Sequence, residues 1–246
     1  MVNDIAPRLS LVRERISAAC LRSGRDEKEI LLMGVTKFQP LEAIEEAWKN
    51  GIGLFGENRV QEGIEKFASF YEANPGIRTG TAAPAGAPKA ELHLIGQLQR
   101  NKAKKAAEFF DCIQSADRES LIDELGVLTA DWKDPLKIFL EFHTGEDSKT
   151  GFMDLDSLFR AAEKTVSFPG LLPLGLMTMA PFTGDKKVIR AAFQSCRRAA
   201  EEIKKRFPGK GAWSCLSMGM SGDYEIAVEE GSTLIRIGTA IFGERQ

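Results

Sequence analysis

The sequence has few of the residues that hold metal ions or form disulfides. It contains two histidines, and its four cysteines are scattered without a C-x-x-C pair. Neither a zinc site nor a disulfide framework is therefore indicated. No excess of one charge sign is present either, because 33 basic and 35 acidic side chains give a net charge of -2. This balance does not favour a nucleic-acid or membrane partner.

Long hydrophobic runs are also missing. No stretch is long and apolar enough to span a bilayer. Charged side chains interrupt residues 1–15, where a signal peptide would have an apolar core. We therefore expect a cytoplasmic protein. With 246 residues, 43% of them hydrophobic, the chain suits one large domain, and a (β/α)8 barrel has about this size.

Strand-like apolar runs alternate with amphipathic helical patterns along the chain, after a first helix predicted at residues 4–22. Strands are expected near residues 31–37, 52–56, 91–96, 111–115, 136–143, 171–178, 213–218 and 233–237. Helices are expected near residues 40–49, 58–71, 100–108, 118–130, 155–165, 185–206 and 223–230. This alternation predicts a parallel sheet. Its close spacing favours an α/β fold with a single (β/α)8 TIM-type barrel and an extra N-terminal helix.

Two segments suggest other features at first sight. Residues 74–90 are rich in Pro, Gly and Ala. We interpret them as a mobile loop inserted before the third strand, so that residues 1–246 form one domain. The basic cluster at residues 100–105 is typical of the solvated face of a helix, and we do not assign it to nucleic-acid binding.

Lys37 closes the apolar run of the first predicted strand. In a barrel, ligand chemistry takes place at the carboxyl ends of the strands. Partial desolvation there lowers the pKa of a lysine and frees its amine for Schiff-base chemistry. The alternative for a lone lysine is a side chain that leaves the strand for solvent.

Two glycine-containing loops follow the seventh and eighth predicted strands, where barrels often bind phosphate. The first contains Ser217 and Ser221 and ends at Asp223, a candidate helix N-cap. The second contains Gly238 and Thr239, which offer a backbone N–H and a hydroxyl. Each loop alone is compatible with an ordinary strand-to-helix turn. Both together, in these two positions, favour a phosphate site.

Arg236 lies inside an apolar strand, and a buried guanidinium needs a partner. That partner is either an acid on a neighbouring strand, Glu57 or Glu141, or a bound ligand.

Three further side chains lie in segments at the ends of predicted strands and point to the same barrel mouth: Asn58, His93 and Met177. The alternative roles are a helix cap for Asn58, a strand polar group that forms its hydrogen bonds within the protein for His93, and a core residue for Met177.

Together these residues resemble the pyridoxal phosphate homeostasis proteins, which are similar to the barrel domain of alanine racemase. The matching stretches are residues 35–37, 55–58, 93–102, 175–177, 217–221 and 236–243. The resemblance implies pyridoxal 5'-phosphate (PLP) held as an internal aldimine on Lys37, with Arg236 facing the pyridine nitrogen. It also implies phosphate binding by Ser217, Gly238 and Thr239, with Ser221 a weaker candidate. Asn58 and Met177 complete the expected cofactor-binding set.

The resemblance further implies a carrier, buffer or regulator of PLP. We expect a monomer, with apo PLP-dependent enzymes as the recipients of PLP. An arginine at the pyridine nitrogen leaves that nitrogen unprotonated and the ring a poor electron sink. The chain ends directly after the eighth predicted strand, without the second domain that gives alanine racemase its tyrosine base. We therefore expect no appreciable catalysis.

Two alternative functions remain open. One is a PLP-dependent enzyme, such as an amino-acid racemase that acts slowly or that uses Tyr224 as its second base. The other is a barrel enzyme for a phosphorylated sugar, in which Lys37 forms a Schiff base with the substrate itself.

Overall fold

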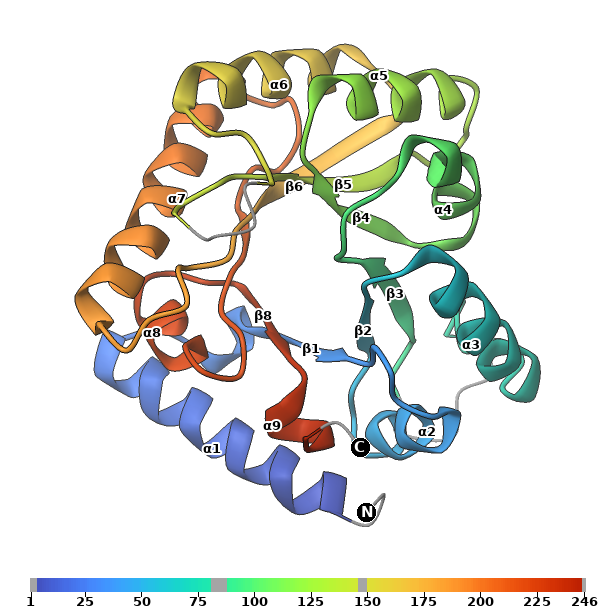
Figure 1. The fold of residues 1–246 in the computed structure, drawn as a ribbon, viewed down its shortest axis with the longest axis vertical. Coiled ribbons are helices and arrows are strands. Elements are labelled where there is room, and N and C mark those ends of the chain that lie inside the picture. Colours follow the sequence, from blue (N-terminus) through green and yellow to red (C-terminus); the bar gives the residue numbers. More distant parts are fainter. Residues whose placement is uncertain (1–3, 81–87, 146–149, 245–246) are drawn as a thin grey trace.

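The computed structural model describes residues 4–80, 88–145 and 150–244. Eight parallel strands form a closed barrel in sequence order, and the last strand pairs with the first. Figure 1 looks into this barrel, with the helices arranged as a ring outside the strands. The barrel predicted from the sequence is confirmed.

The strands lie close to their predicted positions. They are β1 (Leu31–Val35), β2 (Leu54–Glu57), β3 (Glu91–Leu94), β4 (Cys112–Ala116), β5 (Leu136–Glu141), β6 (Leu171–Met177), β7 (Cys215–Ser217) and β8 (Leu234–Ile237). β7 begins later than predicted. Trp213, just before it, has a positive φ of 46° and donates its indole N–H to the carbonyl of Lys210 at 2.7 Å. Such a backbone conformation does not fit a strand.

Helices connect the strands as expected. They are α1 (Ile5–Ser23), α2 (Leu41–Lys49), α3 (Val60–Ala73), α4 (Ala103–Phe109), α5 (Glu119–Leu128), α6 (Leu155–Ser167), α7 (Lys186–Arg206), α8 (Tyr224–Glu229) and α9 (Thr239–Phe242), with short 3-10 turns at Glu27–Glu29 and Arg100–Lys102. We did not predict α9. It is a single turn, too short for a periodic apolar pattern to reveal.

α1 is the extra N-terminal helix. It buries one stripe that includes Leu9, Val12 and Ile16, and it ends at Gly24, whose positive φ of 68° suits a glycine. Its buried stripe packs along α8 and α9 outside the barrel (Figure 1). The helix therefore covers the side where the last and first barrel units meet.

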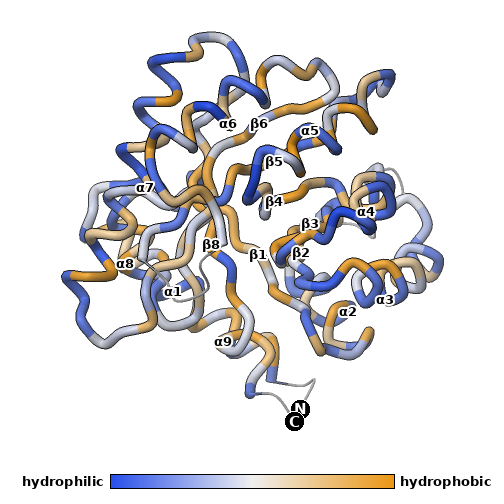
Figure 2. The backbone as a smooth tube through the Cα atoms, turned by 45° about the horizontal axis from the view of Figure 1, so that its top comes forward, coloured by the Kyte–Doolittle hydropathy of each residue, from blue (hydrophilic) through white to orange (hydrophobic). Residues whose placement is uncertain are grey.

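The core has two parts, because successive side chains of a strand point to opposite faces. The larger part lies between the strands and the helices. The smaller part fills the barrel interior and consists of Met33, Cys112, Phe139, Met177 and Leu234. Figure 2 shows the strands coloured mainly as hydrophobic, whereas the helices alternate between hydrophilic and hydrophobic segments. This pattern follows from strands that are covered on both faces.

Part of the predicted 74–90 loop, residues 81–87, lies outside the described residues. The part before it is packed on the barrel, since Ile77 is 1% exposed. The carbonyl of Ile77 accepts a hydrogen bond from the N–H of Ala90 at 3.1 Å. The described ends of this insert are thus joined to each other beside β3.

Within the three described segments, no helix has the length and apolar character needed to cross a membrane. The same segments contain no group of three or more His, Cys, Asp or Glu side chains suited to hold a metal ion.

Candidate functional site

A cavity of about 250 Å³ lies at the carboxyl ends of the strands. It is lined by Val35, Lys37, Asn58, Ile95, Met177, Met179, Met220, Ser221, Gly222, Arg236, Gly238 and Thr239. The structure therefore brings together every predicted cofactor-binding residue except Ser217.

Lys37 is half-buried and lies in a tight turn that follows β1. The N–H of Gln39 donates to the carbonyl of Thr36 at 2.9 Å and closes this turn. Phe38 adopts a positive φ of 63°, which is rare for a residue other than glycine. Its N–H donates to the carboxylate of Glu62 at 2.7 Å. These contacts hold an unfavourable backbone conformation in place and thereby fix the position of Lys37.

A buried ion pair between Lys66 and Glu57 stabilises the backbone of this turn. The ammonium of Lys66 donates to the carbonyl of Thr36 at 2.8 Å and to Oε1 of Glu57 at 2.9 Å. The hydroxyl of Thr36 also donates to that Oε1, at 2.7 Å. Glu57 is completely buried, which raises the pKa of its carboxyl group, and Lys66 partly offsets this rise. The network fixes the end of β1 against β2 and α3.

Arg236 is 4% exposed and still lines the cavity. Its Nη1 donates to the carbonyl of Ser217 at 2.6 Å, and its Nη2 to the carbonyl of Thr178 at 2.9 Å. Burial lowers the pKa of its guanidinium to about 10, so the group stays protonated at neutral pH. Among the described residues it forms no direct ion pair, and Glu57 pairs with Lys66 instead. Asp223 and Glu141 act on the guanidinium through their charges and offset part of the effect of burial on its pKa.

Ser217 is fully buried and is not part of the cavity wall. Its hydroxyl accepts a hydrogen bond from Nη1 of Arg236 at 2.8 Å and donates to Oε1 of Gln114 at 2.6 Å. The amide nitrogen of Gln114 lies 2.8 Å from Nδ1 of His93. Ser217 therefore positions Arg236 from inside the barrel, and its predicted contact with phosphate stays a prediction.

Ser221, the weaker candidate from the sequence, does line the cavity. Its hydroxyl accepts a hydrogen bond from the N–H of Ala240 at 3.2 Å, which ties the two predicted phosphate loops together. Asp223 does not cap α8 through its side chain as we expected. Its carboxylate accepts from the N–H of Met220 at 2.6 Å and closes the loop that carries Ser221.

Asn58 is not a helix cap, because α3 begins at Val60 with Arg59 in the capping position. Its Oδ1 is buried and has no hydrogen-bond partner in the part of the chain that the structure describes. A side chain on Gly96 would lie 2.2 Å from the carbonyl oxygen of Asn58, so only glycine fits there. Asn58 thus offers an unused acceptor to a ligand.

We did not predict Val35, Ile95 and Met179 as wall residues. Val35 lies two residues before Lys37, and Met179 two residues after Met177. Side chains two residues apart in an extended chain point to the same side. For Val35 and Met179 this signal was therefore present in the sequence.

The chain resembles known proteins over nearly its full length. Residues 20–246 match the family described as "Alanine racemase, N-terminal domain". A pyridoxal phosphate homeostasis protein from Aquifex aeolicus is 35% identical over 239 residues, which cover 97% of this chain and 97% of that protein.

Two solved structures are also similar. A protein from Bifidobacterium adolescentis, described as unknown, is 34% identical with a TM-score of 0.89, and the match covers 98% of this chain and 95% of that one. The PipY protein of Synechococcus elongatus PCC7942, solved with PLP bound, is 34% identical with a TM-score of 0.76, and the match covers 94% of this chain and 100% of that one.

Proposed function

Because this chain belongs to the family of pyridoxal phosphate homeostasis proteins and carries the alanine racemase N-terminal domain, we propose that it binds PLP covalently through Lys37 and acts in PLP homeostasis. The observation that carries this proposal is the meeting of Lys37 and Arg236 in one cavity. The proposed recipients of PLP are apo PLP-dependent enzymes, and the proposed acting form is a cytoplasmic monomer.

The residues of the cavity fit PLP chemically. Lys37 offers an amine for the aldehyde, and the hydroxyls of Ser221 and Thr239 lie on the two glycine-containing loops. The unpartnered Oδ1 of Asn58 provides a polar contact that the protein itself does not use. The cavity, about 250 Å³, is slightly below the usual range for small-molecule sites, which suits a small cofactor.

PLP, when bound, supplies an aldehyde for covalent attachment and a ring that can delocalise electrons. The amine of Lys37 bonds to the aldehyde carbon, and one water is released. Arg236 can only donate hydrogen bonds, so opposite the pyridine nitrogen it would leave that nitrogen without a proton. The ring is then a weak electron sink, which favours storage and delivery of PLP over catalysis.

The tyrosines of the chain also argue against the racemase alternative. Tyr71 and Tyr224 both belong to the described residues, and neither lines the cavity. Tyr224 is 3% exposed, and burial raises the pKa of its phenol, so it is poorly placed to act as a base. The alternative with a phosphorylated sugar predicts a colourless protein.

The test is an absorption spectrum of the purified protein before and after borohydride treatment, followed by peptide mapping. We expect a visible band that borohydride removes, with the pyridoxyl group fixed on Lys37. A colourless protein that does not bind added PLP, or a label recovered on another lysine, would contradict the proposal.

A further inference from the structure

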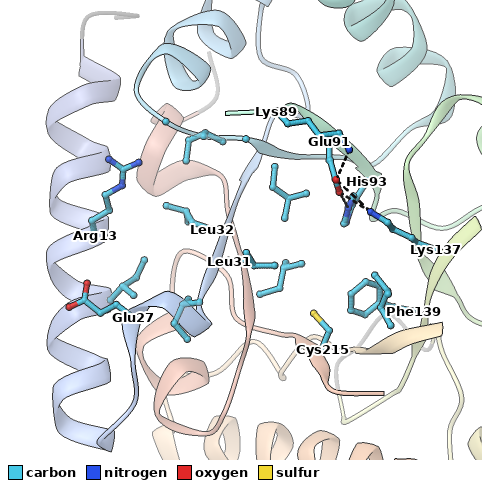
Figure 3. Close-up of a pocket in the computed structure, with 18 residues that line it drawn as sticks. Arg13, Glu27, Leu31, Leu32, Lys89, Glu91, His93, Lys137, Phe139 and Cys215 are labelled. Atoms are coloured by element: carbon cyan, nitrogen blue, oxygen red, sulfur yellow. Dashed lines mark hydrogen bonds and ion pairs between the residues drawn. The ribbon is translucent and has the colours of Figure 1, made fainter. Parts of the chain in front are cut away.

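A second and larger cavity, about 690 Å³, lies at the opposite, amino-terminal end of the barrel. The first residues of several strands line it, among them Leu31, Glu91 and Leu234, and α1 contributes Arg13 (Figure 3). Met33, Cys112 and Met177 of the inner core lie between this cavity and the one that holds Lys37. The two cavities are therefore separate.

Most of the wall is apolar. It includes Ile16, Leu31, Leu54, Phe139 and Leu234, and Leu31 is 53% exposed although it begins a barrel strand. Apolar surface gains free energy when it is removed from water. A concave, mainly apolar wall with a few polar groups is typical of a small-molecule site.

The polar groups are not evenly spread. Figure 3 shows Lys89, Glu91, His93 and Lys137 gathered on one side of the cavity, away from Arg13. The ammonium of Lys89 lies 3.1 Å from one oxygen of Glu91, and that of Lys137 lies 3.3 Å from the other. Two ammonium groups thus share one carboxylate, and one positive charge on this side is not neutralised by Glu91.

His93 adds a hydrogen-bond donor whose direction can be derived. Arg236 can only donate, so the hydroxyl of Ser217 accepts from it and must give its own proton to Oε1 of Gln114. The other amide atom of Gln114 is then its nitrogen, which donates to Nδ1 of His93 at 2.8 Å. Burial lowers the pKa of His93 and keeps its ring neutral. The ring proton therefore lies on Nε2.

In the described part of the chain, the interaction partner of that nitrogen is Glu91, and no acceptor lies within hydrogen-bond distance of it. His93 is 4% exposed, and its Nε2 has no hydrogen-bond partner among the described residues. The nearest carboxylate oxygen, Oε2 of Glu91, lies 3.8 Å away, beyond hydrogen-bond distance. A buried N–H without an acceptor is unfavourable, and a ligand oxygen that enters beside Glu91 would relieve this.

We propose that the amino-terminal cavity is a second ligand site, for a small carboxylic acid with an apolar tail. Its carboxylate lies at Lys89, Lys137 and His93. Its tail lies against the apolar wall formed by Leu54, Phe139 and Leu234.

Three probes with the same apolar part test the choice of ligand: 3-phenylpropanoate, 3-phenylpropan-1-ol and 3-phenylpropylamine, each titrated by isothermal calorimetry into the PLP-loaded protein and the PLP-free protein. We expect saturable binding of the acid, about tenfold tighter than the alcohol, with the amine weakest. The affinity for the acid should agree within twofold between the two forms of the protein.

Variants of the protein test where the acid binds. Lys137→Met removes one ammonium and keeps an apolar stem, so affinity for the acid should fall about tenfold while affinity for the alcohol stays unchanged. Lys49→Met, an exposed position on α2, is the matched control and should change neither. Leu31→Trp, at the exposed rim, should weaken both ligands.

Several results would overturn the proposal. They are a lack of saturable binding of the acid, an amine that binds tightest, competition between the acid and PLP for one site, or equal effects of Lys137→Met and Lys49→Met.

Discussion

Arg236 donates two hydrogen bonds to Ser217, one to its carbonyl oxygen at 2.6 Å and one to its hydroxyl at 2.8 Å. The pair holds a buried cation in place although no carboxylate of the described residues contacts it directly. The guanidinium keeps its charge and stays at the wall of the cavity that also contains Lys37.

Ser217→Ala should weaken PLP binding about tenfold, because Arg236 loses one of the acceptors that orient it. Absorbance titration with PLP measures this effect. Ser232→Ala is a matched control, since the Ser232 hydroxyl is also fully buried but bonds to backbone carbonyls, including that of Met218 at 2.7 Å. The control should lower stability and leave PLP affinity unchanged. If both variants bind PLP like the parent protein, the positioning role of Ser217 is wrong.

Arg236→Gln should change the absorption spectrum of bound PLP and weaken its binding. No carboxylate of the described chain pairs with Arg236, so its removal should cost less than the ~3–5 kcal/mol that follows when a buried ion pair is broken. Urea denaturation of the PLP-free variant measures this. A large loss of stability together with an unchanged spectrum would show that Arg236 is structural only.

Lys37→Ala should abolish the visible band and the borohydride-stable label, because no other lysine lines the cavity among the residues that the structure describes. The barrel should still fold, since a half-buried side chain in a turn contributes little to the core. Lys49→Ala, on the exposed surface of α2, should keep the band. Circular dichroism and absorbance on the same samples separate the two effects.

Lys66→Met should destabilise the protein by about 3–5 kcal/mol at pH 7, because it leaves the buried carboxylate of Glu57 without its cation. The pKa of Glu57 is already raised by burial, and loss of Lys66 raises it further. The folded state then binds this proton more tightly than the unfolded state does. Its stability therefore falls as pH rises from the unfolded pKa through the folded pKa.

The loss of unfolding free energy caused by Lys66→Met should accordingly be larger at pH 7 than at pH 5. Urea denaturation at both pH values measures it. The double variant Lys66→Met with Glu57→Gln should recover part of the loss. An equal loss at both pH values would count against a charged Glu57.

The protein should not turn over common L- or D-amino acids at an ordinary enzyme rate, on the order of 1 per second. The reason is the proposed position of Arg236 opposite the pyridine nitrogen, where an electron sink needs an acid. Two assays test this prediction: steady-state turnover of the amino acids, and transfer of PLP from this protein to an apo-enzyme. Turnover at that rate would favour the racemase alternative.

The barrel and most of the residues that line the Lys37 cavity could be predicted because both depend on local pattern. Alternating strands and helices predict parallel pairing, and parallel pairing places all the strand ends at one mouth. Lys37 and Arg236 could therefore be assigned to one site although they lie far apart in the sequence. The structure confirms the barrel and the common cavity.

Features that depend on the path of a loop could not be predicted. Ser217 and Ser221 are separated by Gly219, whose φ of 98° turns the chain so that only Ser221 reaches the cavity. Nothing in the side-chain pattern of that loop gives this direction. The link between Gln114 and Ser217 joins residues 103 positions apart, and such contacts arise only once the barrel has closed.

The closing pair of the barrel is β1 with β8, and the proposed PLP site lies across it, with Lys37 after β1, Arg236 in β8 and Thr239 at the start of α9. During synthesis Lys37 emerges long before Arg236 and Thr239. A nascent chain thus cannot assemble the site until β8 has left the ribosome. PLP should consequently act late in folding. Because it binds only the closed barrel, it should stabilise this state against forms in which β8 has separated from β1.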